Sequence, residues 1–121
     1  MRRALLSDRE AGLPDVDAAI SDAENLIEQG QFDEAIEIGT RLERLGFVAG
    51  VDLQAMALTA RGDRGKAIAL LRSRLADEHW PWSLYELLGN YLSDEGRFSE
   101  AHEAYDDAEK RDGDPYRIAL N

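Results

Sequence analysis

Apolar residues between positions 84 and 108 follow two successive stripes, each with the three- and four-residue spacing of a helix face. The two stripes consist of Leu84, Tyr85, Leu88, Gly89 and Leu92, and of Ala101, Ala104, Tyr105 and Ala108. Gly96 lies between them, and glycine readily adopts the positive φ at which helices end. Ser99 is a good N-cap for the second helix, and residues 112–115 end the pattern. Residues 85–108 therefore predict a helical hairpin with a short turn.

Two weaker copies of this pattern precede it. Three residue types recur at the same intervals of 32 and 34 residues: Gly30, Gly62 and Gly96; Ala35, Ala67 and Ala101; and Leu26, Leu58 and Leu92. The chain is therefore predicted to contain three helical hairpins. We expect Asp15 and Asp33 to be the N-caps of the first two helices. We also expect residues 46–50 to form the connection that closes the first hairpin, tightened because the first interval is two residues short.

The best-preserved copy resembles a tetratricopeptide repeat (TPR). The signature positions of that family are filled in order by Tyr85, Leu88-Gly89, Leu92, Gly96, Phe98, Ala101, Tyr105 and Ala108. Departures are Leu92 for an aromatic residue and Gly113 for proline. The second copy has Arg64 for the aromatic residue of the turn and Arg74 for an alanine. In the first copy Gly39 stands where Tyr105 stands later, which leaves less volume in the core.

The resemblance implies an all-α fold, a right-handed α-solenoid of three TPR-like helical hairpins. We predict an N-terminal arm at 1–14, repeats at 16–47, 48–81 and 82–115 within a domain of residues 15–115, and a short tail at 116–121. In this family a final solvating helix usually covers the last hairpin, and we expect the last hairpin here to lack that cover. Trp80 and Trp82 flank Pro81 between the second and third repeats, where they either brace the junction or act as binding hot spots.

Composition excludes several classes of protein. The 121 residues are 44% hydrophobic, enough for a packed core, and contain no cysteine for disulfides or thiolate metal sites. No apolar run approaches the roughly 20 residues of a membrane helix. The first 15 residues hold Ala4-Leu5-Leu6 as their apolar run, which is too short for a signal peptide. We therefore expect a cytoplasmic protein, and a small bacterial one is our leading hypothesis. The excess of arginine over lysine suggests a GC-rich genome.

The net charge of −11 is unevenly distributed. Residues 16–47 carry −6, residues 48–81 carry +1 and residues 82–115 carry −7, while residues 1–15 are balanced. Such a surface should repel nucleic acid and anionic membranes. The acids either form part of a binding surface or solvate the outer faces of the helices.

No catalytic constellation is apparent. The sequence shows no nucleophile–base pair, phosphate-binding glycine loop or metal-ligand spacing, so we predict no enzyme and no cofactor. His102 lies among Glu100, Glu103 and Asp106, a group that could bind a metal adventitiously or be solvated surface. Pairs such as Glu37 and Arg41, four residues apart, favour helix stability over acid–base catalysis.

In the family, the first helix of each hairpin lines a concave groove, and this resemblance implies the binding residues here. They are Asp17, Ile20, Glu24, Ile27, Asp52, Met56, Thr59, Glu86, Asn90 and Asp94, with Glu28, Ala60, Ser83 and Ser93 beside them. Family members that serve the large heat-shock chaperones hold a C-terminal carboxylate with Lys, Asn and Arg on this stripe. Asn90 alone matches, so we expect a basic or neutral peptide as partner. The alternative is an unoccupied groove, with the convex side or a chain end binding instead.

Two functions follow from this resemblance. The first is a non-catalytic adaptor or scaffold that holds a segment of a partner protein in an acidic groove. The second is a self-associating or secretion-chaperone type of protein, which would form a homodimer through its uncapped ends.

Overall fold

The computed structural model describes residues 15–77 and 81–112, which form six α-helices and no strand within these ranges. The helices are α1 (Val16–Glu28), α2 (Phe32–Arg44), α3 (Val48–Ala60), α4 (Arg64–Leu75), α5 (Ser83–Asp94) and α6 (Phe98–Asp112). The expected all-α class is confirmed. The predicted arm at 1–14, Trp80 and the tail at 116–121 lie outside the described residues.

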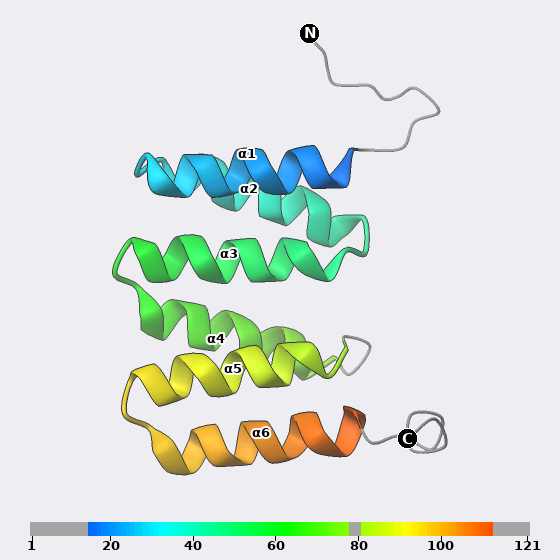
Figure 1. The fold of residues 1–121 in the computed structure, drawn as a ribbon, viewed down its shortest axis with the longest axis vertical. Helices are drawn as coiled ribbons and strands as arrows, with labels where there is room; N and C mark the ends of the chain where they lie inside the picture. Colours follow the sequence, from blue (N-terminus) through cyan, green and yellow to red (C-terminus); the bar gives the residue numbers. More distant parts are fainter. Residues whose placement is uncertain (1–14, 78–80, 113–121) are drawn as a thin grey trace, which may run out of the picture.

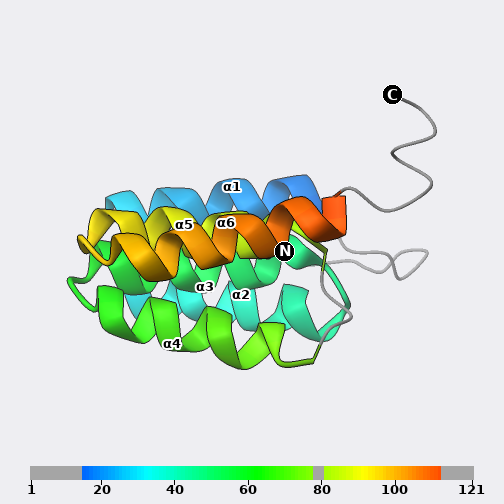
Figure 2. The ribbon, with the colours of Figure 1, turned by 90° about the horizontal axis from the view of Figure 1, so that it is seen from below.

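Consecutive helices run in opposite directions and stack in chain order along the long axis (Figure 1). α1 packs on α2, α3 on α4 and α5 on α6, while α2 on α3 and α4 on α5 join the hairpins. Seen from the end of the stack, α1 and α4 lie on opposite sides (Figure 2). Among the described residues, no helix is long and apolar enough to cross a membrane.

The recurring glycines and leucines form the turns of the hairpins. Gly30, Gly62 and Gly96 have φ of +79°, +97° and +76°. After each glycine, the next N–H donates a hydrogen bond of 2.8 to 2.9 Å to the carbonyl of Leu26, Leu58 or Leu92. This is the Schellman arrangement that closes a helix C-terminus. The predicted turns are confirmed, and the two residue types share a period because they belong to one turn.

The helix starts differ in part from the expected N-caps. Asp15 is confirmed, because its Oδ1 accepts a 3.0 Å hydrogen bond from Ala18 N. The prediction that Asp33 and Ser99 are N-caps was wrong, since α2 and α6 already begin at Phe32 and Phe98. The helix starts two residues after the turn glycine, so these side chains fall inside the first turn. Asp33 there still interacts favourably with the helix dipole.

Residues 46–50 are also not a loop throughout, because α3 begins at Val48 and contains Gly50. Gly50 lies where α3 crosses α2. A Cβ atom on Gly50 would lie 2.3 Å from Glu43 N and 2.4 Å from Gly39 O. Close approach of the α3 backbone therefore takes up the volume that Gly39 was expected to leave empty.

The buried apolar residues form two clusters. One, from α1, α2 and α3, consists of Ala23, Ala35, Leu42, Leu53 and Ala57. The other extends from α3 to α6 and includes Leu71, Leu84 and Leu92, which are among the largest fully buried side chains. In the third hairpin the ring of Tyr105 lies against Gly89, where a Cβ atom would be 2.6 Å from Tyr105 Cε1. Small residues thus set the helix spacing at both ends of the stack.

Four arginines of the second hairpin reach acids of its neighbours. Arg61 binds Asp33 at 3.0 Å and Arg74 binds Glu43, both in the first hairpin. Arg64 binds Glu95 at 3.0 Å and Arg72 binds Glu100 at 2.6 Å, both beside or within the third. The arginine-containing middle segment thus lies between two acidic segments and pairs with both.

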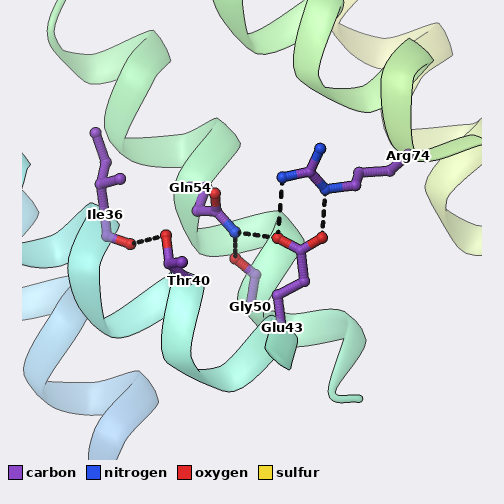
Figure 3. Close-up of polar contacts among 6 residues, drawn as sticks. All are labelled: Ile36, Thr40, Glu43, Gly50, Gln54 and Arg74. Carbon is purple, nitrogen blue, oxygen red and sulfur yellow. Dashed lines mark hydrogen bonds and ion pairs between the residues drawn. The ribbon is translucent and has the colours of Figure 1, made fainter. Parts of the chain in front are cut away.

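The pair between Arg74 and Glu43 belongs to a larger network. Gln54 is buried, and its Nε2 donates to Glu43 Oε1 at 2.8 Å and to the Gly50 carbonyl at 3.1 Å. Figure 3 shows the carboxylate of Glu43 between Gln54 and Arg74. The network joins α2, α3 and α4, and it explains why arginine replaces the small residue that the repeat pattern favours at position 74.

Candidate functional site

The first helices of the three hairpins lie side by side, since α1 contacts α3 and α3 contacts α5. A hollow of about 300 Å³ opens between α3 and α5. Its lining consists of Val48, Ala49, Asp52, Ser83, Leu84, Glu86, Leu87 and Asn90. We call this feature the α3–α5 hollow.

Helical spacing places both sets of lining residues. Ser83, Glu86, Leu87 and Asn90 occur at intervals of three and four residues, so they share one face of α5. The first two turns of α3 supply Val48, Ala49 and Asp52 in the same way. The hollow therefore combines four apolar residues with two carboxylates, a hydroxyl and an amide.

Asp52 is the half-buried carboxylate of this hollow. Burial raises the pKa of Asp52 above its ordinary value of 3.8, and the nearby charge of Glu24 on α1 raises it further. Both causes disfavour the ionised form of the side chain. A cation placed against Asp52 would reverse this effect.

The acids of this face differ from those elsewhere on the molecule. Within the described residues, Glu24, Asp52 and Glu86 form no ion pair with a basic side chain. In contrast, the acids at the turns and on the second helices hold the neighbouring arginines, as the pairs that involve Asp33, Glu43, Glu95 and Glu100 show. The surface around the hollow thus carries uncompensated negative charge.

Tyr91 continues the polar region beyond the hollow. Burial is the main cause that raises the pKa of Tyr91, the charges of Asp52 and Asp94 add to it, and the Thr59 hydroxyl and Arg64 act in the opposite direction. The Thr59 hydroxyl is itself buried without a hydrogen bond of normal geometry in the described part of the chain. Three predicted site residues, Asp52, Thr59 and Asp94, therefore influence the pKa of a tyrosine that was not predicted, although Tyr91 follows Leu88 by three residues on the buried face of α5.

The remaining predicted residues are placed differently. Ile20, Ile27 and Met56 are half-buried and pack against the core of the first hairpin, so the apolar strip that they offer is shallow. Asp17 is exposed in the first turn of α1 and does not line the hollow.

Asn90 is already engaged, since its Oδ1 accepts a 2.6 Å hydrogen bond from the Tyr105 hydroxyl. Its NH₂ group is the part that remains for a ligand. The apolar lining residues Ala49, Leu84 and Leu87 were not predicted. The spacing of Leu87, four residues after Ser83 and one after Glu86, was the signal that could have found it.

A second hollow of about 300 Å³ lies among α4, α5 and α6. It is lined by Arg72, Leu75, Ala76, Tyr85, Leu88, Leu92, Glu100, Glu103, Ala104 and Asp107. Arg72 and Glu100 pair with each other across it. Ala104 is buried, whereas Tyr105 beside it is 37% exposed, so part of the apolar surface expected on the last helix is present.

The acidic residues near His102 in the sequence do not form a metal site with it. His102 Nε2 lies 3.7 Å from Asp106 Oδ2 on an exposed face of α6. Within the described ranges, no group of three or more His, Cys, Asp or Glu side chains is arranged to hold a metal ion.

No protein-family model, curated protein or solved structure matches this chain. What the protein does is therefore inferred from the contacts and charges described above.

Proposed function

We propose that the chain is a non-catalytic protein–protein interaction module, an adaptor or scaffold of the tetratricopeptide type. Its three hairpins would form a right-handed α-solenoid, and α1, α3 and α5 would hold a basic segment of a partner protein. We also propose a cytoplasmic location, because the sequence lacks long apolar runs, and a bacterial source.

The spacing of the helices supports a concave binding face. α3 contacts both α1 and α5, whereas in the described residues α2, α4 and α6 make no comparable contacts among themselves. Long arginine side chains bridge the wider side instead, from Arg74 to Glu43 and from Arg72 to Glu100. A stack that is closer on one side than on the other curves toward the closer side. The α3–α5 hollow would then lie on the inside of the curve.

The observation that carries the proposal is the uncompensated charge around an apolar hollow. Asp52 is held half-buried beside Glu24 at a raised pKa, and Leu84 and Leu87 lie in the same hollow as Glu86. Lysine and arginine side chains fit such a surface, because their stems pack on apolar groups while their charged ends meet carboxylates. An extended segment with basic and apolar side chains is therefore the expected ligand.

Charge-neutralising variants test this proposal. Glu24→Gln/Asp52→Asn/Glu86→Gln removes the acids of the groove while it preserves their shape. Asp22→Asn/Glu34→Gln/Glu109→Gln removes the same charge from exposed positions outside the hollow. Fluorescence anisotropy with a labelled basic–apolar peptide should show binding weakened about tenfold in the first variant. Equal affinities for the two variants would contradict a site in the groove.

Self-association, including a secretion-chaperone role, is the second candidate. It is favoured by Phe98, which is 68% exposed at the start of α6, and by the second hollow among α4, α5 and α6. Light scattering at micromolar concentration tests it with the full chain and with Phe98→Ser. A monomer in both cases would contradict this candidate, whereas a dimer lost in the variant would support it.

A further inference from the structure

The first six residues of the chain have the chemistry that the α3–α5 hollow accepts. The sequence MRRALL contains Arg2 and Arg3, no acidic residue, and the apolar pair Leu5 and Leu6. Around the hollow lie the carboxylates of Asp52 and Glu86 and apolar side chains of α3 and α5. Basic groups next to leucines therefore complement acids next to leucines in both charge and hydropathy.

The hollow lies at the end of the molecule where the chain enters α1. α1, α3 and α5 run in the same direction and begin at the same end of the stack (Figure 1). The lining residues belong to the first two turns of α3 and of α5. The segment that precedes Asp15 is thus attached on the same side of the molecule as the hollow.

The connecting segment is long enough to span this distance. Packed helices lie about 8–10 Å apart, so the hollow is on the order of 15 Å from α1 across α3. Residues 7–14 can extend over roughly 26 Å. The first six residues can therefore reach the hollow with slack in the connection.

Tethering favours this contact even where the intrinsic affinity is weak. A connection of this length holds a ligand at an effective concentration in the millimolar range. Glu24, Asp52 and Glu86 have no basic partner in the part of the chain that the structure describes, so the arginines would not displace an existing ion pair. The gain from neutralising the half-buried Asp52 would therefore not be offset by a broken pair.

We propose that residues 1–6 dock in the α3–α5 hollow of their own chain. Arg2 and Arg3 face Asp52 and Glu86, and Leu5 and Leu6 pack on the apolar lining. This inference rests on the proposed function, because it makes the arm an internal ligand of the partner-binding groove. A basic segment of another protein then has to displace the arm before it can bind.

Paramagnetic relaxation measures the contact in the full chain. The protein contains no cysteine, so Ser7→Cys provides a single attachment point for a nitroxide label. The label should broaden the amide signals of Ala49, Asp52 and Leu87 far more than those of Gly30, Gly62 and Gly96 at the opposite end. Adding Arg2→Glu/Arg3→Glu should remove this difference. Equal broadening in the presence and absence of the arginines would overturn the proposal.

A mixed sample establishes which chain supplies the arm. Chains that carry the nitroxide but no ¹⁵N are mixed with ¹⁵N chains that carry no nitroxide. Broadening of the ¹⁵N signals then reports only contacts between copies. Docking within one chain predicts no broadening at Ala49 or Asp52 in the mixture. Broadening there would overturn the intramolecular form of the proposal.

A peptide titration separates failure of this inference from failure of the proposed function. An external basic–apolar peptide should bind Arg2→Glu/Arg3→Glu about threefold to tenfold more tightly than the unaltered chain, because the internal competitor is lost. Equal, measurable affinities would overturn the inference and leave the groove as a binding site. Absence of binding to either protein would overturn the proposed function, while the relaxation measurement would still decide where the arm docks.

Discussion

Arg74 of α4 binds Glu43 of α2 through two donors of its guanidinium group. Nε donates to Glu43 Oε2, and Nη2 donates to Oε1 at 3.2 Å. The Glu43 side chain is only 15% exposed, and Gln54 Nε2 donates to the same Oε1. This bidentate pair fixes the second hairpin against the first on the side where the helices are further apart.

Arg74→Ala should lower the free energy of unfolding by about 2 kcal/mol, since it leaves a half-buried carboxylate with one of its partners missing. The matched control is Arg41→Ala, which removes the exposed pair with Glu37 and should cost only about 0.3–0.5 kcal/mol. Urea denaturation followed by circular dichroism measures both. Equal costs for the two variants would show that the interhelical pair is no stronger than a surface pair.

Gly50→Ala tests the close crossing of α2 and α3. The added methyl group would overlap the backbone at Glu43 and Gly39, so we expect a loss of about 3 kcal/mol or more. Gly65→Ala is the control, because no heavy atom lies within 4 Å of that position and the residue is helical. It should be neutral or stabilise by about 0.5 kcal/mol. Thermal unfolding measures both variants. Equal changes in melting temperature for the two would contradict the close crossing of α2 and α3.

The contact between Gly89 and Tyr105 predicts a coupling that can be measured. Gly89→Ala should destabilise the protein by about 1–3 kcal/mol, because its methyl group would meet the tyrosine ring. In a Tyr105→Ala background the same change should cost little, since the ring is gone and alanine favours the helix. A double-mutant cycle in urea gives the coupling energy directly. Additive effects would rule out the contact.

Much of this fold was predictable because its signals are local. The turn glycines and the leucines that close them recur with one period, and the structure uses them in three equivalent turns. The starts of α2 and α6 were predicted two residues late, because turn geometry rather than the best capping side chain decides where these helices begin.

Other features could not be predicted because they join residues far apart in the chain. Arg74 and Glu43 are separated by 31 positions, and nothing in the local pattern shows which acid an arginine will reach. The negative charge of the α3–α5 hollow was predictable from Asp52 and Glu86 in the sequence. Its apolar lining, including Leu87, required the position of α3 against α5.

Asp52 predicts a pH dependence of stability. Its pKa in the folded protein is raised above the ordinary value of 3.8, so ionisation of this group opposes folding at neutral pH. The penalty should disappear as the pH falls through the raised pKa toward 3.8. The test uses an Arg2→Gln/Arg3→Gln background, which removes the arginines proposed to face Asp52. In that background Asp52→Asn should be more stable than its parent at pH 7, with the difference vanishing on acidification. Asp22→Asn is the control, and a difference between Asp52→Asn and its parent that is constant with pH would contradict the placement of Asp52.

The central claim is that a basic segment binds between α3 and α5. Chemical-shift mapping of the full ¹⁵N-labelled chain with a basic–apolar peptide and its acidic counterpart tests it most directly. The basic peptide should shift the amides of Ala49, Asp52, Leu87 and Asn90, and the acidic peptide should leave them unchanged. Shifts confined to the second hollow, at Arg72, Tyr85 and Glu103, or equal responses to both peptides, would contradict the account.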